Sequence, residues 1–211
     1  IPKQKNIVVE DEIHVRYSGH IQLEKANVDA DGVEIPGTRR VAVPWFKNTI
    51  TDIGLNAKGT GIRPWCVVGT GTNAIVNGTL TLTNYRASQD SQPASTHGIV
   101  TDETGTYGYI RNTHRFLAGN GTGVISELGL TIEGDINARN IFCGSLVKDA
   151  LGNPTTITKL ADELLDVLYE VRMYAKETDD VYTVNINGNN HTFRTRAEVV
   201  DVNTWGAFMF T

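Results

Sequence analysis

The order of apolar and polar residues predicts a chain built mainly from short strands. Residues 13–17 and 21–24 alternate apolar and polar side chains with a period of two, which is typical of a strand with one buried face. We expect further strands at 33–43, 65–68, 79–85, 98–102, 107–116, 124–132 and 141–148. Within 79–85, the alternation places Leu80 and Leu82 on the inward face.

Glycine-containing dipeptides and polar runs mark the connections between these strands. Asp31-Gly32 predicts a type I′ hairpin turn, and Asn187-Gly188 predicts a second one between strands at 181–186 and 191–195. The stretch 87–97 is expected to be a polar loop, and 119–123 a glycine-rich turn.

One short helix is expected near residues 48–58. Asn48 or Thr49 would cap it and Gly59 would end it, while Trp45 and Phe46 would pack it against a sheet. Gly54 costs a helix about 1 kcal/mol relative to Ala, so this helix depends on packing.

The stretch 160–174 fits two structures. Leu160, Leu164 and Leu168 could share a helix face, but the residues from Leu165 to Met173 also alternate as in a strand. The aromatic and β-branched side chains favour a long strand, after one helical turn at 161–164.

Strands at this spacing with turn signals between them predict a mostly β fold, an antiparallel, jelly-roll-like β-sandwich. We assign the sandwich domain to residues 46–211. Residues 1–45 form an N-terminal β-hairpin arm, and the sequence leaves open that this arm is part of the main domain.

Composition agrees with this fold class and limits the partners. The chain has 25 Thr, 17 Asn and 21 Gly but only 6 Pro, a mixture that suits strands and tight turns. A net charge of −5 and a pI of about 5.5 argue against nucleic acid as a partner. The sequence has no apolar run of the ~18 residues that a membrane-spanning helix needs, so we expect no membrane insertion.

Cys66 and Cys143 both lie among apolar neighbours. This setting favours two buried free thiols. A disulfide is the less favoured alternative, and metal ligation is less favoured still.

The sequence contains no concentrated set of reactive residues. Neither Gly69-Thr-Gly71 nor the 119–123 turn has the spacing of a nucleotide-binding loop, and no GxSxG elbow is present. Asp29-Ala-Asp31-Gly32 begins like a calcium loop but lacks the distal Glu. We therefore expect no catalytic, cofactor-binding or metal-binding residues, no cofactor, and a protein that is not an enzyme.

The last residues are unusually apolar. Trp205, Phe208 and Phe210 lie within seven residues of each other. They could cap the core of their own domain, or insert into a neighbouring subunit as aromatic anchors do. In the second case they mark an assembly interface.

Two separated groups of residues resemble a known family. The first comprises Asp29-Ala-Asp-Gly-Val33, then Trp45-Phe-Lys-Asn-Thr-Ile-Thr-Asp-Ile-Gly-Leu55, and Val68-Gly-Thr-Gly-Thr72. The second comprises Gly152-Asn-Pro-Thr-Thr-Ile-Thr158, Leu160-Ala-Asp-Glu-Leu-Leu-Asp-Val167 and Tyr169-Glu-Val-Arg-Met-Tyr174. Both are similar to segments of virion structural proteins of tailed bacteriophages, of the tail, tail-fibre and baseplate kind. Ala175-Lys176 stands where that family has a Pro-Pro pair.

The resemblance implies a structural subunit of the virion, assembled in the bacterial host cytoplasm. Such a protein would act in the tail, baseplate, collar or fibre anchor by binding other copies of itself and other tail proteins. The alternative is a receptor-binding, glycan-binding or capsid-decoration module that uses the loops at 87–97 and 119–123, with a host surface glycan as its partner.

Overall fold

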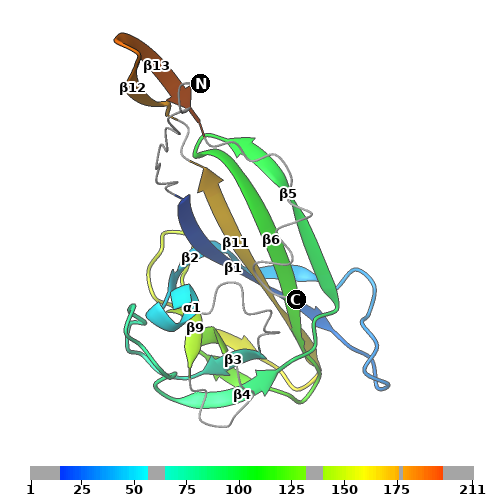
Figure 1. Ribbon diagram of the computed structural model, residues 1–211. Coiled ribbons are helices and arrows are strands. Elements are labelled where there is room, and N and C mark those ends of the chain that lie inside the picture. Colours follow the sequence, from blue (N-terminus) through cyan, green and yellow to red (C-terminus); the bar gives the residue numbers. More distant parts are fainter. Residues whose placement is uncertain (1–14, 57–64, 132–139, 176–177, 197–211) are drawn as a thin grey trace.

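The computed structural model describes residues 15–56, 65–131, 140–175 and 178–196 (Figure 1). Its elements are β1 (Val15–Asn27), β2 (Arg40–Ile50), α1 (Asp52–Asn56), β3 (Trp65–Gly69), β4 (Tyr85–Gln89), β5 (Ala94–Asp102), β6 (Gly105–Phe116), β7 (Gly123–Ile125), β8 (Glu127–Thr131), β9 (Ile141–Leu146), β10 (Ile157–Lys159), β11 (Glu163–Ala175), β12 (Asp180–Ile186) and β13 (Asn189–Thr195).

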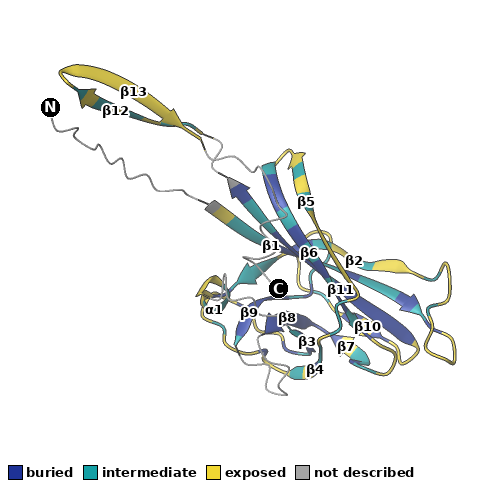
Figure 2. Ribbon diagram, turned by 45° about the vertical axis from the view of Figure 1, so that its right-hand side comes forward, coloured by how far each residue is buried: buried dark blue, intermediate teal, exposed yellow. Residues whose placement is uncertain are grey.

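Nine of the strands form one antiparallel sheet in the order β4-β3-β8-β9-β2-β1-β11-β6-β5. The sheet curls, so that its short strands β4, β3, β8 and β9 lie against the long strands of the other half (Figures 1 and 2). The sequence-based prediction of a mostly β, antiparallel, sandwich-like fold with one short helix is confirmed. Here a single curled sheet supplies both layers.

β2 is the corner strand where the two halves meet. It pairs with β1 along much of its length, whereas only Thr49 and Ile50 at its end pair with β9. A bulge at Pro44 interrupts the pairing with β1, where three residue steps of β2 match two of β1. A bulge tolerates proline, which cannot donate to the ladder, and it bends the strand.

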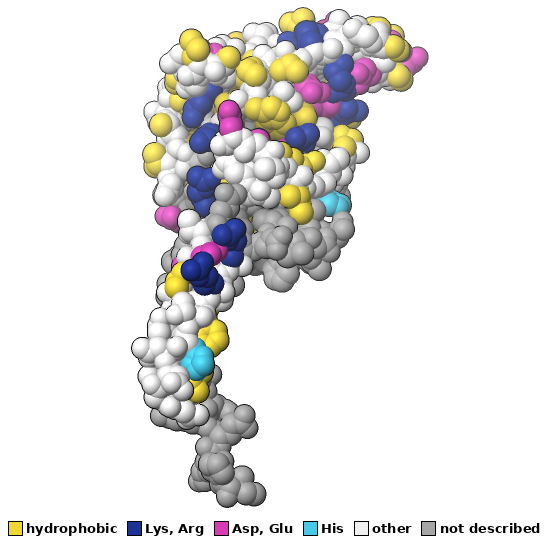
Figure 3. Space-filling view, turned by 90° about the horizontal axis from the view of Figure 1, so that it is seen from above, with side chains coloured by type: hydrophobic (Ala, Val, Ile, Leu, Met, Phe, Trp, Pro, Cys, Tyr) yellow, Lys and Arg dark blue, Asp and Glu magenta, His cyan; other side chains and the backbone are white. Residues whose placement is uncertain are grey.

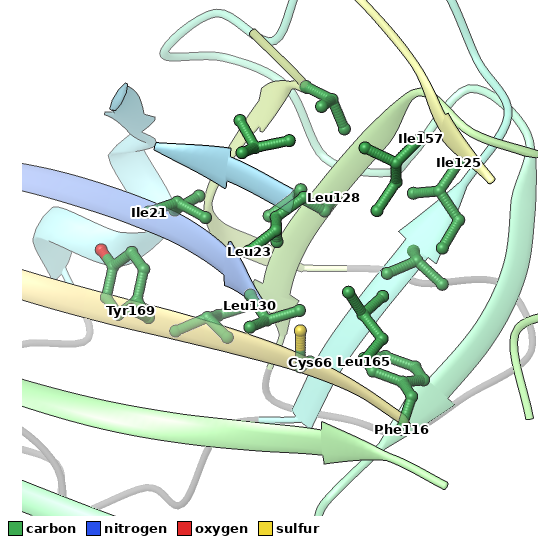
Figure 4. Close-up of a cluster of buried hydrophobic side chains, with 14 of the residues drawn as sticks. Ile21, Leu23, Cys66, Phe116, Ile125, Leu128, Leu130, Ile157, Leu165 and Tyr169 are labelled. Atoms are coloured by element: carbon green, nitrogen blue, oxygen red, sulfur yellow. The ribbon is translucent and has the colours of Figure 1, made fainter. Parts of the chain in front are cut away.

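The core lies between the two halves of the sheet (Figure 4). Ile21, Leu23 and Leu165 from the long strands face Leu128 and Leu130 from the short ones, and all five are almost fully buried. The small sheet formed by β7 and β10 adds Ile125 and Ile157 at one end of this cluster.

The long strand β11 spans Glu163–Ala175, so the strand prediction for 165–174 is confirmed. Leu165, Val167 and Tyr169 face the core, as the alternation indicated. The predicted helical turn at 161–164 does not form, because Glu163 already pairs with Asn27 on β1.

The expected helix exists but is shorter than 48–58. Residues 45–50 are part of β2, and α1 begins only at Asp52. Its cap is Thr51, whose Oγ1 accepts a hydrogen bond from the Gly54 amide at 3.2 Å. α1 is the only helix within the described residues, and it is too short to cross a membrane.

The loop at Asp31-Gly32 is not a type I′ turn. The Gly32 amide donates to the Asp29 carbonyl at 3.0 Å, and only Gly32 has a positive φ, so the central residues of the turn are Ala30 and Asp31. The strand that follows begins at Arg40 rather than at residue 33. Asp29 Oδ1 holds the loop by accepting from the Asp31 and Val33 amides, at 3.0 and 2.9 Å.

The Asp149 loop has the same design. Its Gly152 amide donates to the Asp149 carbonyl at 3.0 Å, and Asp149 Oδ1 accepts from the Leu151 and Asn153 amides at 2.9 Å each. These amide bonds stabilise the ionised carboxylate and lower the pKa of Asp149. Each of the two groups of residues that resemble virion proteins therefore begins in a loop held by an Asp side chain, at 29–33 in the first group and at 152–153 in the second.

Two further predictions are wrong. Residues 79–84 are not a strand, and Leu80 is exposed while Leu82 is buried. The expected loop at 87–97 is largely strand, because β4 extends to Gln89 and β5 begins at Ala94. Residues 94–97 have small or polar side chains and are all exposed, which suits a strand with little burial.

The hairpin at Asn187-Gly188 is confirmed. Both residues have positive φ, at 52° and 85°, as a type I′ turn requires. The division into residues 1–45 and 46–211 stays a prediction. In the described part of the first segment, β1 lies between β2 and β11 inside the main sheet.

Glu127 on β8 is fully buried and fixes two loops at once. Its carboxylate accepts hydrogen bonds from the backbone amides of Gly71, Thr83 and Asn84, at 2.8, 3.0 and 2.7 Å. A Cβ at position 71 would approach the Glu127 carboxylate to 2.4 Å. Gly71 is therefore needed for the close approach of backbone to carboxylate.

We expect the substitution Glu127→Gln to lower the free energy of unfolding by about 2 kcal/mol. The amide nitrogen would face a backbone N–H and leave buried donors without an acceptor. Urea unfolding measures the difference. Glu103→Gln, at an exposed turn, is the matched control and should stay within about 0.5 kcal/mol of the parent. Equal stability of both variants would contradict this role of Glu127.

Candidate assembly surfaces

The hairpin of β12 and β13 forms an arm that extends beyond the end of β11 (Figures 1 and 2). Within the described residues, these two strands pair only with each other. Tyr182, Val184 and Ile186 share one face with His191 and Phe193. The Tyr182 and Phe193 rings stack at 6.3 Å, and Phe193 is 43% exposed. Hydrophobic side chains and a histidine are visible on the surface of the arm (Figure 3).

The other face of the arm is mainly polar, with Val181 as its exposed apolar side chain. Thr183 lies opposite Thr192, and Asn185 donates to Asn190 Oδ1 at 2.8 Å. The arm therefore has an apolar face and a polar face although it is only one hairpin thick. An isolated two-stranded hairpin is marginally stable in water, and an exposed apolar face is a typical feature of an interaction site.

The sheet ends at β4 on one side, and this edge is covered. The 119–123 loop packs beside it, with Asn120 Nδ2 donating to the Ser88 carbonyl at 3.3 Å. The Arg86 guanidinium donates to the Thr122 carbonyl of the same loop. This loop, expected as a glycan-contacting loop, thus has a structural role at the β4 edge.

One open pocket of about 490 Å³ lies where the curled sheet opens, between β1, β2 and α1. Tyr17, Lys47 and Asn77 contribute its ring, cation and amide groups, and burial raises the pKa of Tyr17. Asn48 also lines the pocket, and the nitrogen and oxygen of its side-chain amide are buried without a hydrogen-bond partner. This lining combines an aromatic ring with hydrogen-bonding groups.

The outer face of the long strands carries ion pairs in rows across the sheet. Arg115 on β6 binds Asp166 on β11 through two bonds of 2.7 and 2.6 Å, and Arg111 binds Glu170 in the next row. These acidic side chains are only 2% exposed, so each is covered by an arginine. Pairing with Asp166 raises the pKa of Arg115. The rows hold β6 and β11 in register.

Cys66 and Cys143 are both buried free thiols. Both pair with Leu130, from opposite sides, so the strand β8 separates them. Strands lie about 4.8 Å apart, and a separation of two strands exceeds the roughly 7 Å limit for a disulfide. Burial raises the pKa of both thiols, that of Cys143 to about 12, so neither is a reactive thiolate.

Comparison of the chain with protein-family models, with curated proteins and with solved structures finds no match. The function must therefore be argued from the surfaces of this molecule.

The residues expected at an assembly interface, Trp205, Phe208 and Phe210, lie outside the described residues. Within the described ranges, no three His, Cys, Asp or Glu side chains gather as a metal site would require. The arm was predicted as a hairpin, but its isolation from the sheet was not.

His20 on β1 lies opposite Glu170, on the same outer face as the ion-pair rows of β6 and β11, and is 8% exposed. Its ring nitrogen is 3.0 Å from Ser18 Oγ. Burial lowers the pKa of His20 to about 4, and the nearby Arg172 adds to this, against the opposing effect of Glu170. The folded protein therefore holds this ring neutral at neutral pH.

We expect the free energy of unfolding to fall by about 2 kcal/mol as the pH drops from 6.5 towards 4. In this window the unfolded chain binds a proton at His20 that the folded chain does not, so acidification favours unfolding. Carboxylates with a lowered pKa, such as Glu163, lose their contribution to stability mainly at a pH below this window. Urea titrations at several pH values measure the slope. His20→Gln should flatten it, and an unchanged slope would contradict this assignment.

Proposed function

We propose that this protein is a structural subunit of a tailed-bacteriophage virion, in the tail, baseplate, collar or fibre anchor, and that it works by protein–protein assembly. The apolar face of the projecting β12–β13 arm is the observation that carries the assembly part of the proposal. A two-stranded arm gains stability when a third surface covers its apolar face. The placement in a phage particle is supported by the resemblance of 29–33, 45–55, 68–72, 152–158, 160–167 and 169–174 to virion proteins.

The described residues also provide rigid support for such a role. The arm follows directly after β11, which pairs with β1 and β6 along almost its whole length. On the outer face, Arg39 binds both Glu24 of β1 and Asp166 of β11, and Arg115 of β6 binds the same Asp166. A load passed along the chain from the arm into β11 would therefore be shared with β1 and β6.

We expect electron microscopy of the intact particle to locate this chain in density, with the arm against another virion protein or another copy. Replacing both Tyr182 and Phe193 by Ala should reduce incorporation into particles at least tenfold, because the apolar face is lost. Thr183→Ala, on the polar face, is the matched control and should incorporate normally. Quantitative mass spectrometry of purified particles measures this. Absence of the parent chain from particles would overturn the proposal.

The pocket at Tyr17 favours a second candidate function, a receptor- or glycan-binding module of the particle. A ring beside amide, hydroxyl and ammonium groups suits a hydroxyl-rich ligand, since it offers both an apolar surface and hydrogen bonds. The pocket differs from the two loops that the sequence suggested.

Under this second function, the purified protein should bind host polysaccharide. The single variants Lys47→Ala and Asn77→Ala should each lower the affinity at least tenfold. Both side chains are exposed, so these variants should keep the fold. Asn73→Ala, in a nearby exposed turn, is the control. Surface binding to immobilised polysaccharide is the measurement, and no binding by the parent protein would remove this candidate.

A further inference from the structure

The lining of the pocket at Tyr17 carries a positive charge and no negative one. Lys47 contributes its ammonium group, and the described residues that line the pocket include no Asp or Glu. Lys47 is exposed, and it forms no ion pair in the part of the chain that the structure describes. Its charge can therefore pair with a ligand.

The cations of the neighbouring outer face are already paired. Arg111 and Arg172 both bind Glu170, and Arg115 binds Asp166. Each of these arginines is held by an acid of the sheet itself. Lys47 differs from them, although it lies on the same side of the sheet, opposite His20.

A second ammonium group lies beside the lining. Lys148 Nζ donates to the Lys47 carbonyl at 3.4 Å. The acids nearest in sequence lie outside the lining, since Asp52 begins α1 and the Asp149 carboxylate accepts the amides of its own loop. The pocket thus has ammonium groups in and beside its lining, and its carboxylate neighbours are set apart from it.

The hydrogen-bonding groups of the lining favour a ligand that brings acceptors. An ammonium such as that of Lys47 has three donors and no acceptor, and the amide of Asn77 adds an N–H₂ group. An ionised carboxylate only accepts, and its hydrogen bond to an ammonium is stronger than a neutral one. The hydroxyls of a neutral sugar would find no carboxylate in this lining to accept from them. The pocket therefore favours an anionic ligand over a neutral one.

We propose that this pocket binds a sugar unit that carries a carboxylate, and that Lys47 pairs with this carboxylate. Tyr17 and Leu55 provide apolar surface for the sugar ring, and a volume of about 490 Å³ is within the range of small-ligand sites. The single ammonium of the lining matches a carboxylate better than a phosphate monoester, whose charge is about −1.5 to −2. The inference rests on the second candidate function, and it names the class of sugar that the pocket takes.

The test compares acidic polymers with their own neutral forms. Polygalacturonate and polysialate are immobilised beside their carboxyl-reduced derivatives, in which each carboxylate has become a primary alcohol. The parent protein should bind at least one acidic polymer about tenfold more tightly than its reduced form, as expected for a hydrogen bond to a charged group. Salt should weaken this preference, because it screens exposed charges. Surface binding at low and high salt measures both effects.

Two variants test the assignment to Lys47 and to the pocket. Lys47→Gln should remove the preference for the acidic polymer. Asn77→Asp places a carboxylate in the lining at nearly unchanged size, and it should lower the affinity for the acidic polymer about tenfold through like-charge repulsion. Asn73→Asp, outside the lining, controls for an added negative charge, and Arg194→Gln on the exposed arm controls for a lost positive charge. Both controls should bind as the parent does, and circular dichroism verifies that each variant is folded.

Equal affinity of the parent protein for the acidic and reduced forms would overturn the inference and leave a glycan-binding function standing. A preference for the acidic polymer that survives Lys47→Gln would overturn it as well. Failure to bind either acidic polymer also overturns it. Binding of host polysaccharide by the same protein would then still support the second candidate function, whereas its absence would remove both.

Discussion

The nine-stranded sheet encloses a core because β2 belongs to both of its halves. The inner face of the long strands carries Ile21, Leu23 and Leu165, and these side chains must be covered to be removed from water. The bulge at Pro44 and the short pairing of Thr49 and Ile50 with β9 turn the sheet at this point. The short strands can then lie over the long ones. The pocket at Tyr17 lies beside this corner, so it too depends on the curl.

The buried acidic side chains Glu127, Asp166 and Glu170 each have partners. Glu127 is surrounded by backbone amides, and Asp166 and Glu170 lie under arginines of neighbouring strands. These contacts do not drive folding, since the cost of desolvating a charge offsets much of its gain. They do specify register, because a slip of one residue would move Asp166 and Glu170 to the apolar side of β11. The same ion pairs join neighbouring strands and so stiffen the outer face of the sheet.

The described residues present two surfaces that suit a partner. The β12–β13 arm carries an apolar face, and the pocket at Tyr17 carries a ring beside hydrogen-bonding groups. An apolar face gains free energy from almost any apolar cover, whereas the pocket requires a ligand that pairs with its polar groups, so the pocket is the more selective surface.

The sequence by itself determined the features that depend on neighbours along the chain. The type I′ hairpin at Asn187-Gly188 and the alternation in β11 follow from backbone freedom at glycine and from the two-residue period of strands. Only the tertiary structure decided which strands pair, because pairing joins residues far apart in sequence. Glu127 shows this, since its three amide donors come from other loops. The same holds for residues 45–50, whose apolar side chains suit a helix or a strand until β1 and β9 provide a ladder. The place of β5 as the last strand of the nine-stranded sheet is likewise set by pairing, and no local pattern encodes that place.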